Sequence, residues 1–290
     1  MSRPMTTLPA PMPDARFWQL MTHIDRPLLL SGQDDESLAP LRAALTQLPA
    51  DDIIAFALRL ADRLAALLTA SRARTGPFGD DGLLYAACHA VARGQAWFEA
   101  SMRWPAMFDD ADADPDTSWC ESLLYLPREA WSQATGAGED DFPVWTLEEG
   151  LAPFAGKLPA STAGDAVRRP ATSPTAYTVY ASFEQHPGIA RHVEPEENVR
   201  VTLAGLLDDY FWCLLDLDDY LGIVNEQGQS FQILHDASKN LYWAEVPCEA
   251  DKASYGQEFS REALLDLLHR LPVNFDRAMF EAPQKLAWDE

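Results

Sequence analysis

The sequence predicts an α+β protein: an N-terminal all-helical domain followed by a smaller α+β domain with an antiparallel sheet. In the first half, apolar residues recur at the three- and four-residue spacing of helices, whereas in the second half they alternate in short runs. Between the halves, residues 152–176 consist mostly of Ala, Pro, Gly, Ser and Thr. The predicted division is a disordered lead over 1–13, a helical domain over 14–150, a linker or long loop over 151–176, and an α+β domain over 177–290.

Helical periodicity is clearest over residues 51–72, which follow the breaker Pro49. The apolar stripe of this helix is Ile53, Phe56, Leu60, Leu64, Leu67 and Leu68. The same spacing predicts further helices over residues 14–24, 35–48, 80–93 and 95–104.

The second half changes period. Residues 177–184 alternate as a strand does, and residues 199–215 are apolar at helical spacing. Three strand-like runs follow at 220–225, 230–235 and 241–246, joined by loops short enough for hairpins. Ser260 then begins a closing helix. These elements predict an antiparallel sheet of three to four strands.

The chain is strongly acidic, with a formal net charge of -23 from 45 acidic and 22 basic residues. Residues 1–150 carry 23 acidic and 11 basic residues, and residues 151–290 carry 22 and 11, so the charge belongs to both domains. Such a surface repels nucleic acid and anionic membranes and attracts a cationic protein. Neither a transmembrane run nor a secretory signal is apparent, so the expected location is cytoplasmic.

The sequence contains none of the familiar catalytic or cofactor motifs. Its four cysteines stand far apart and are expected to be buried thiols: Cys88, Cys120, Cys213 and Cys248. Its six histidines show no metal-binding spacing, and no glycine-rich phosphate loop is present. We therefore predict no catalytic residues, no metal and no cofactor.

The acidic run from Asp109 to Asp116 resembles a calcium loop, with acids at alternate positions from Asp110. A regular EF-hand needs positive φ at its sixth residue, which here is Pro115, fixed near −65°. A solvated acidic loop is the favoured interpretation, and a looser cation site is the alternative.

A second acidic group surrounds aromatic residues in the C-terminal half. Aromatic side chains ringed by charge are typical of protein interfaces, although they also occur in ordinary cores. The predicted partner-binding set is Asp208, Asp209, Trp212, Asp216, Asp218, Asp219 and Trp243.

The first half resembles the bacterial domain of unknown function 4240 over about residues 14–125. The residues that carry the resemblance are Phe17-Trp18, Leu41 to Leu48, Asp52-Ile53-Ile54, Phe56, Asp80-Asp81, Leu83, Gly94 and Phe98-Glu99. The stretch from Thr75 to Gly79 departs from the family pattern. The resemblance implies a helical fold and no catalytic residues.

Residues 195–282 resemble the C-terminal regions of bacterial immunity proteins, which are small acidic proteins encoded beside toxins. The resembling stretches begin at Asp219, Ser230, Tyr242 and Tyr255. The resemblance implies a cytoplasmic, antitoxin-like protein that occludes a basic toxin.

The leading hypothesis is therefore a non-enzymatic immunity protein that binds a cognate, basic toxin or effector. Two alternatives stay open. One is an enzyme with an unrecognised acidic site, for which the expected reaction is metal-assisted hydrolysis and the residues to test are Asp112 and Asp114. The other is an adaptor that loads an effector, which shares the same binding logic.

Overall fold

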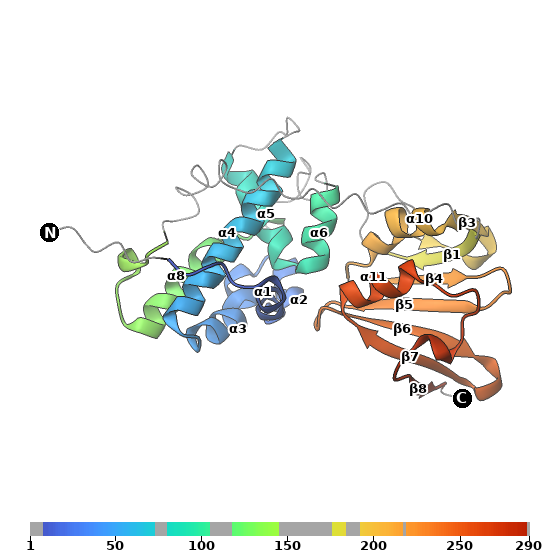
Figure 1. Cartoon of the computed structure of the whole chain (residues 1–290). Coiled ribbons are helices and arrows are strands. Elements are labelled where there is room, and N and C mark those ends of the chain that lie inside the picture. Colours follow the sequence, from blue (N-terminus) through green and yellow to red (C-terminus); the bar gives the residue numbers. More distant parts are fainter. Residues whose placement is uncertain are drawn as a thin grey trace. The chain divides into compact units, whose positions relative to one another are not determined.

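The computed structural model describes residues 8–72, 80–104, 118–144, 176–183, 192–216 and 219–288 (Figure 1). The chain divides into two compact units, Met1–Ala163 and Gly164–Glu290. Helices make up the first unit and an antiparallel sheet dominates the second, so the predicted α+β class is confirmed. Among the described residues, no helix is both long enough and apolar enough to span a bilayer.

The N-terminal unit is a set of helices around one apolar core. They are α1 (Asp14–Met21), α2 (Arg26–Leu30), α3 (Asp34–Thr46), α4 (Ala50–Arg72), α5 (Asp80–Ala92), α6 (Gln95–Arg103) and α8 (Ser122–Thr135). The predicted stripe of α4 is buried as expected, because it faces the other helices of this core. Helix α2 was not predicted; it is a single short segment whose first turn is capped by the Asp25 carboxylate, which accepts from the Leu28 N–H.

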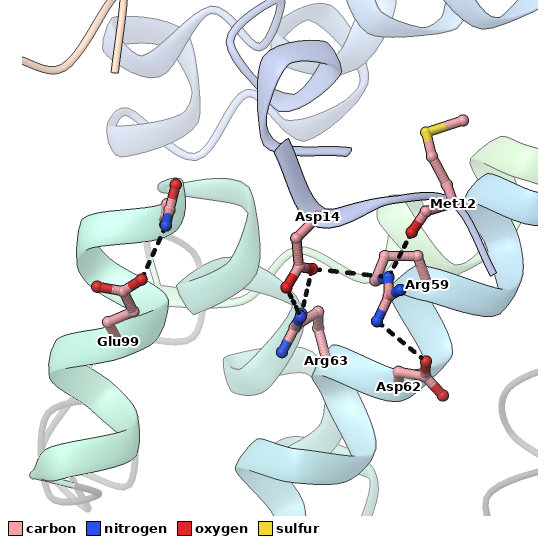
Figure 2. A network of polar contacts seen from close by, with 7 residues as sticks. Met12, Asp14, Arg59, Asp62, Arg63 and Glu99 are labelled. Atoms are coloured by element: carbon pink, nitrogen blue, oxygen red, sulfur yellow. Dashed lines mark hydrogen bonds and ion pairs between the residues drawn. The ribbon is translucent and has the colours of Figure 1, made fainter. Parts of the chain in front are cut away.

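Part of the N-terminal lead is ordered, which corrects the prediction of disorder over residues 1–13. Residues 1–7 lie outside the described part of the chain. Met12 is 2% exposed, and its N–H donates to the Ala55 carbonyl at 2.9 Å. Arg59 Nε donates to the Met12 carbonyl at 2.6 Å, while Asp14 forms ion pairs with Arg59 and Arg63 (Figure 2). Backbone and charged contacts thus attach this segment to α4.

The C-terminal unit is built on one antiparallel sheet. Its strands are β1 (Ala176–Ser182), β2 (His192–Val193), β3 (Val199–Thr202), β4 (Tyr220–Val224), β5 (Ser230–Asp236), β6 (Leu241–Cys248), β7 (Ala253–Phe259) and β8 (Gln284–Ala287). The strand order is β2-β1-β4-β5-β6-β7-β8, and β3 also pairs with β1. The predicted strands over 177–184, 220–225, 230–235 and 241–246 correspond to β1, β4, β5 and β6.

One prediction for this unit is wrong, and another holds only in part. The sheet has eight strands rather than three to four, because the short strands β2, β3 and β8 and the glycine-containing β7 were missed. The helix expected over 199–215 is shorter and irregular: residues 199–202 form β3, which pairs with β1, and consecutive helical turns follow over 203–213, namely α10 (Leu203–Gly205), η4 (Leu206–Tyr210) and η5 (Phe211–Cys213). The Thr202 hydroxyl accepts from the Gly205 N–H and begins the first of these turns.

Helical elements cover one face of the sheet. Helix α11 (Arg261–His269) contacts β6 and β7 and lies across the sheet in Figure 1, and Arg261 at its start packs on Phe211 of η5, so these two elements share one face. Side chains alternate along a strand, so alternate residues face these helices and form the core. Examples are Tyr177, Phe231 and Tyr242, of which Tyr177 and Phe231 pack on Phe275. The intervening residues lie on the other face, which we call the open face.

Candidate protein-binding surface

The residues of the predicted binding set lie in different environments. Asp208 and Asp209, in the π-helical turn η4, are exposed. Trp212 in η5 and Asp216 are half-buried, and Asp219 is fully buried. Asp218 lies outside the described residues.

Trp212 packs within its own unit rather than standing out from it. Arg261 at the start of α11 is 3% exposed, and its Cζ lies 4.5 Å from the centre of the Trp212 ring and 4.9 Å from that of Phe211. Arg261 Nη1 also donates to the Tyr242 hydroxyl. The guanidinium therefore joins η5, α11 and β6 through cation–π and hydrogen-bond contacts.

Asp219 has a structural role, which corrects its inclusion as a surface contact. Its Oδ2 atom accepts from the backbone N–H groups of Leu215 and Asp216, both at 2.7 Å. A buried carboxylate needs such donors to compensate its lost hydration. Asp219 therefore closes the loop that leads into β4, and a partner protein cannot reach it without unfolding that loop.

Trp243 lies on the opposite face of the sheet from Trp212. Its neighbour Tyr242 faces the helices, where its ring is 5.9 Å from Phe211, so alternation places Trp243 on the open face. There its Nε1 donates to Glu245 Oε2 at 2.7 Å. The predicted set therefore does not form one surface.

Two carboxylates that were not predicted as contacts, Glu194 and Glu197, lie near Tyr220 and Tyr210, and Asp209 also lies near Tyr210. Burial, and then the charges of Asp209 and Glu197 among its neighbours, raise the pKa of Tyr210. Burial and the nearby charge of Glu194 raise the pKa of Tyr220. We define the edge patch as the exposed acids of these two segments: Glu194, Glu196, Glu197, Asp208 and Asp209.

The turn that carries the glutamates of the edge patch is well defined. Glu194 and Glu197 form a reciprocal capping box around η3 (Pro195–Glu197), with the Glu194 N–H donating to Glu197 Oε1 at 2.9 Å. Asn198 leaves the turn with φ 50°, and its Oδ1 accepts from the Thr178 hydroxyl on β1. The sequence signal was available as the Glu-Pro-Glu-Glu run before β3.

The described residues offer no evident catalytic centre. They include no group of three His, Cys, Asp or Glu side chains that would hold a metal ion. Cys88, Cys120 and Cys213 are buried free thiols, as predicted, whereas Cys248 is half-buried. Burial and the Asp34 charge raise the pKa of Cys120, so this thiol is protonated and a poor nucleophile. The acidic run over Asp109–Asp116 and its proposed cation site lie outside the described residues.

Comparison with known proteins finds a similarity in the N-terminal unit. Residues 12–133 match the family model described as a protein of unknown function (DUF4240), which confirms the resemblance of the first half. Neither the curated proteins nor the solved structures contain a match to the chain. The family description gives a relationship for the helical unit and no activity.

Proposed function

We propose that this chain is a cytoplasmic immunity protein that binds a cognate, cationic bacterial toxin and neutralises it by occlusion. The observation that supports the proposal is the edge patch, in which the exposed acids Glu197 and Asp209 lie near the half-buried ring of Tyr210 and Glu194 lies near that of Tyr220. Charge at a surface rim accelerates the encounter of oppositely charged proteins and sets the salt dependence of binding.

The location of these acids on ordered backbone also supports a binding role. The capping box around η3 fixes Glu194 and Glu197, and β3 pairs with β1 immediately after them. A preorganised surface loses less conformational entropy when a partner binds. Neighbouring Tyr210 and Tyr220 supply aromatic area of the kind enriched at interfaces.

The test asks whether the protein encoded beside this chain binds to it, and whether this chain protects cells from that protein. Co-expression should protect cells from that protein, and the purified pair should associate more weakly as salt increases. Failure of the adjacent gene product to bind at low salt would refute the proposal. Binding that leaves the toxin fully active would instead support the adaptor hypothesis.

Charge reversal tests the role of the edge patch directly. Glu196→Lys with Asp209→Lys should weaken binding about tenfold at low salt, since exposed charge pairs contribute up to about 1 kcal/mol each. The matched control is Glu249→Lys with Glu281→Lys, which changes the net charge equally. Those two exposed acids lie next to β6 and β7, across the sheet from β1. Equal weakening by both pairs would mean that only total charge matters.

A further inference from the structure

The open face of the sheet carries a regular arrangement of aromatic and acidic side chains. One cross-strand row runs through Tyr180, Gly222, Gln232, Glu245 and Gly256, from β1 to β7. The next row contains Ser182, Tyr220, Leu234, Trp243 and Glu258 on the same strands. Both rows therefore cross five neighbouring strands in register.

Two rings in these rows lie flat over glycines. A Cβ at Gly222 would meet Tyr180 Cζ at 2.0 Å, and a Cβ at Gly256 would meet Trp243 Cζ2 at 2.5 Å. Each ring therefore rests on the backbone of a neighbouring strand. Rings held in this way leave their outer surfaces directed away from the sheet.

These side chains are accessible rather than covered. Leu234 is 39% exposed and Glu258 is exposed, while Tyr180, Tyr220 and Trp243 are half-buried. The opposite face is the covered one, where Phe211 of η5 packs on Tyr242 and Phe280 packs on Phe231. Apolar area that remains exposed beside charged groups is typical of a surface used for binding.

Carboxylates lie directly beside the Trp243 ring. Glu245 accepts the indole N–H of Trp243 at 2.7 Å, so a carboxylate is fixed at the edge of that ring. Glu258 is the cross-strand partner of Trp243 on β7, and it also receives Lys239 Nζ at 3.2 Å. A planar cation above the Trp243 ring would therefore have acids on two sides.

Ring and carboxylate together match the chemistry of arginine. A guanidinium stacks on aromatic faces and donates to carboxylates with its planar edge, whereas an ammonium is a compact, strongly hydrated charge. Two of the chain's own arginines stack on indole rings: Arg93 Cζ lies 3.5 Å from the centre of the Trp97 ring, and Arg261 packs on Trp212. We propose that the open face binds arginine side chains of the cationic partner, with Trp243, Tyr180 and Tyr220 as stacking surfaces.

This inference rests on the proposed function, because it names the partner chemistry that a second surface of the same unit recognises. The edge patch would attract any cation, whereas the open face would distinguish arginine from lysine. The two surfaces therefore predict different measurements.

The test uses the full chain with fluorescent arginine and lysine nonapeptides, whose binding is followed by anisotropy at low salt. The arginine peptide should bind roughly threefold or more tightly, the gain expected of a cation–π contact at an exposed site. Trp243→Leu should remove this preference, and Trp243→Phe should keep most of it. The control is Tyr255→Leu, which removes a half-buried ring from the other face of β7. Circular dichroism checks that each variant is folded.

A second variant avoids any change in packing. Glu245→Gln keeps an amide oxygen for the Trp243 N–H and removes the charge, so it should reduce the arginine preference without unfolding the sheet. If Trp243→Leu and Glu245→Gln leave the ratio of the two affinities unchanged, the inference is overturned while the edge patch stands. If the unmodified chain self-associates and Trp243→Leu does not, the inference is also overturned, because a second copy of the chain would then cover the open face. If Glu196→Lys with Asp209→Lys leaves both affinities unchanged, the edge-patch contribution fails instead.

Discussion

The ring of Tyr180 lies on Gly222, its cross-strand partner, and its hydroxyl accepts from Gln232 Nε2 at 2.7 Å. An aromatic side chain from β1 therefore packs directly on the backbone of β4. Glycine weakens an isolated strand, but here its missing side chain creates the space that the ring fills.

We predict that Gly222→Ala destabilises the C-terminal unit by about 1–3 kcal/mol, because a methyl group must displace the Tyr180 ring. Amide hydrogen exchange of β4 and β5 measures the effect within this unit. The control is Gly205→Ala, since Gly205 has helical dihedrals and its nearest neighbour to an added Cβ is 3.6 Å away. Equal losses in the two variants would show that the ring contact is unimportant.

Strong periodicity and turn chemistry explain which elements were predictable. The hairpins β4-β5 and β5-β6 show alternation on both sides of short polar turns, and Gly228 and Asn240 supply the positive φ values in those turns. Strand β8 was not predictable, because all its residues are exposed and no alternation marks it. In 199–202, long-range pairing of β3 with β1 overrides the local helical pattern, whereas residues 203–213 are helical as that pattern predicts.

The candidate site was predictable only in part. Alternation along β6 would have separated Trp243 from the helix-covered face, since Tyr242 and Trp243 are adjacent in sequence. The burial of Asp219 carries no such signal, because an acidic run looks the same whether its last member faces water or closes a loop. Edge-patch formation by Glu194–Glu197 and Asp208–Asp209 likewise depends on tertiary contacts around Tyr210.

Arg261 and Tyr242 should be energetically coupled. Tyr242→Phe keeps the ring contacts but removes the acceptor for Arg261 Nη1, which should cost about 1–2 kcal/mol. Arg261→Met should cost more, about 2–4 kcal/mol, because it also removes the packing on Phe211 and Trp212. A double-mutant cycle followed by urea unfolding checks the coupling. Strict additivity would contradict a direct interaction.

Arg59 should hold the ordered part of the N-terminal lead against α4. Arg59→Met removes the donor to the Met12 carbonyl and the ion pair with Asp14, so the lead should detach more often. Limited proteolysis should then cleave near Met12 several times faster, which corresponds to a local loss of about 1 kcal/mol. Arg16→Met is the control, because its ion pair with Asp52 is exposed and should contribute little. Similar cleavage rates for the two variants would refute the attachment.

One buried group and one half-buried group, His89 and Asp34, should give the N-terminal unit opposing responses to pH. Burial and the Arg93 charge lower the pKa of His89 from 6.5 to about 3, so the unfolded state binds more protons between these values and stability falls as the pH is lowered. Burial and the Asp35 charge raise the pKa of Asp34 from 3.8 to about 6, so the folded state binds more protons and stability falls as the pH rises through this window.

Substituting each group separately should therefore change the slope in opposite directions. Between about pH 4 and 6, His89→Gln should make stability decline more steeply with rising pH than in the unmodified chain, and Asp34→Asn should make it increase more steeply. The urea concentration at the midpoint of unfolding is measured at several pH values in this range, with amide exchange in α5 and α3 as the readout. Its change with pH gives the slope of stability for each variant. Asp34→Asn should also stabilise the unit at pH 7, because a neutral amide replaces a desolvated carboxylate. Identical slopes in both variants would contradict these assignments, whereas opposite changes would locate the acid response of the unit in His89 and Asp34.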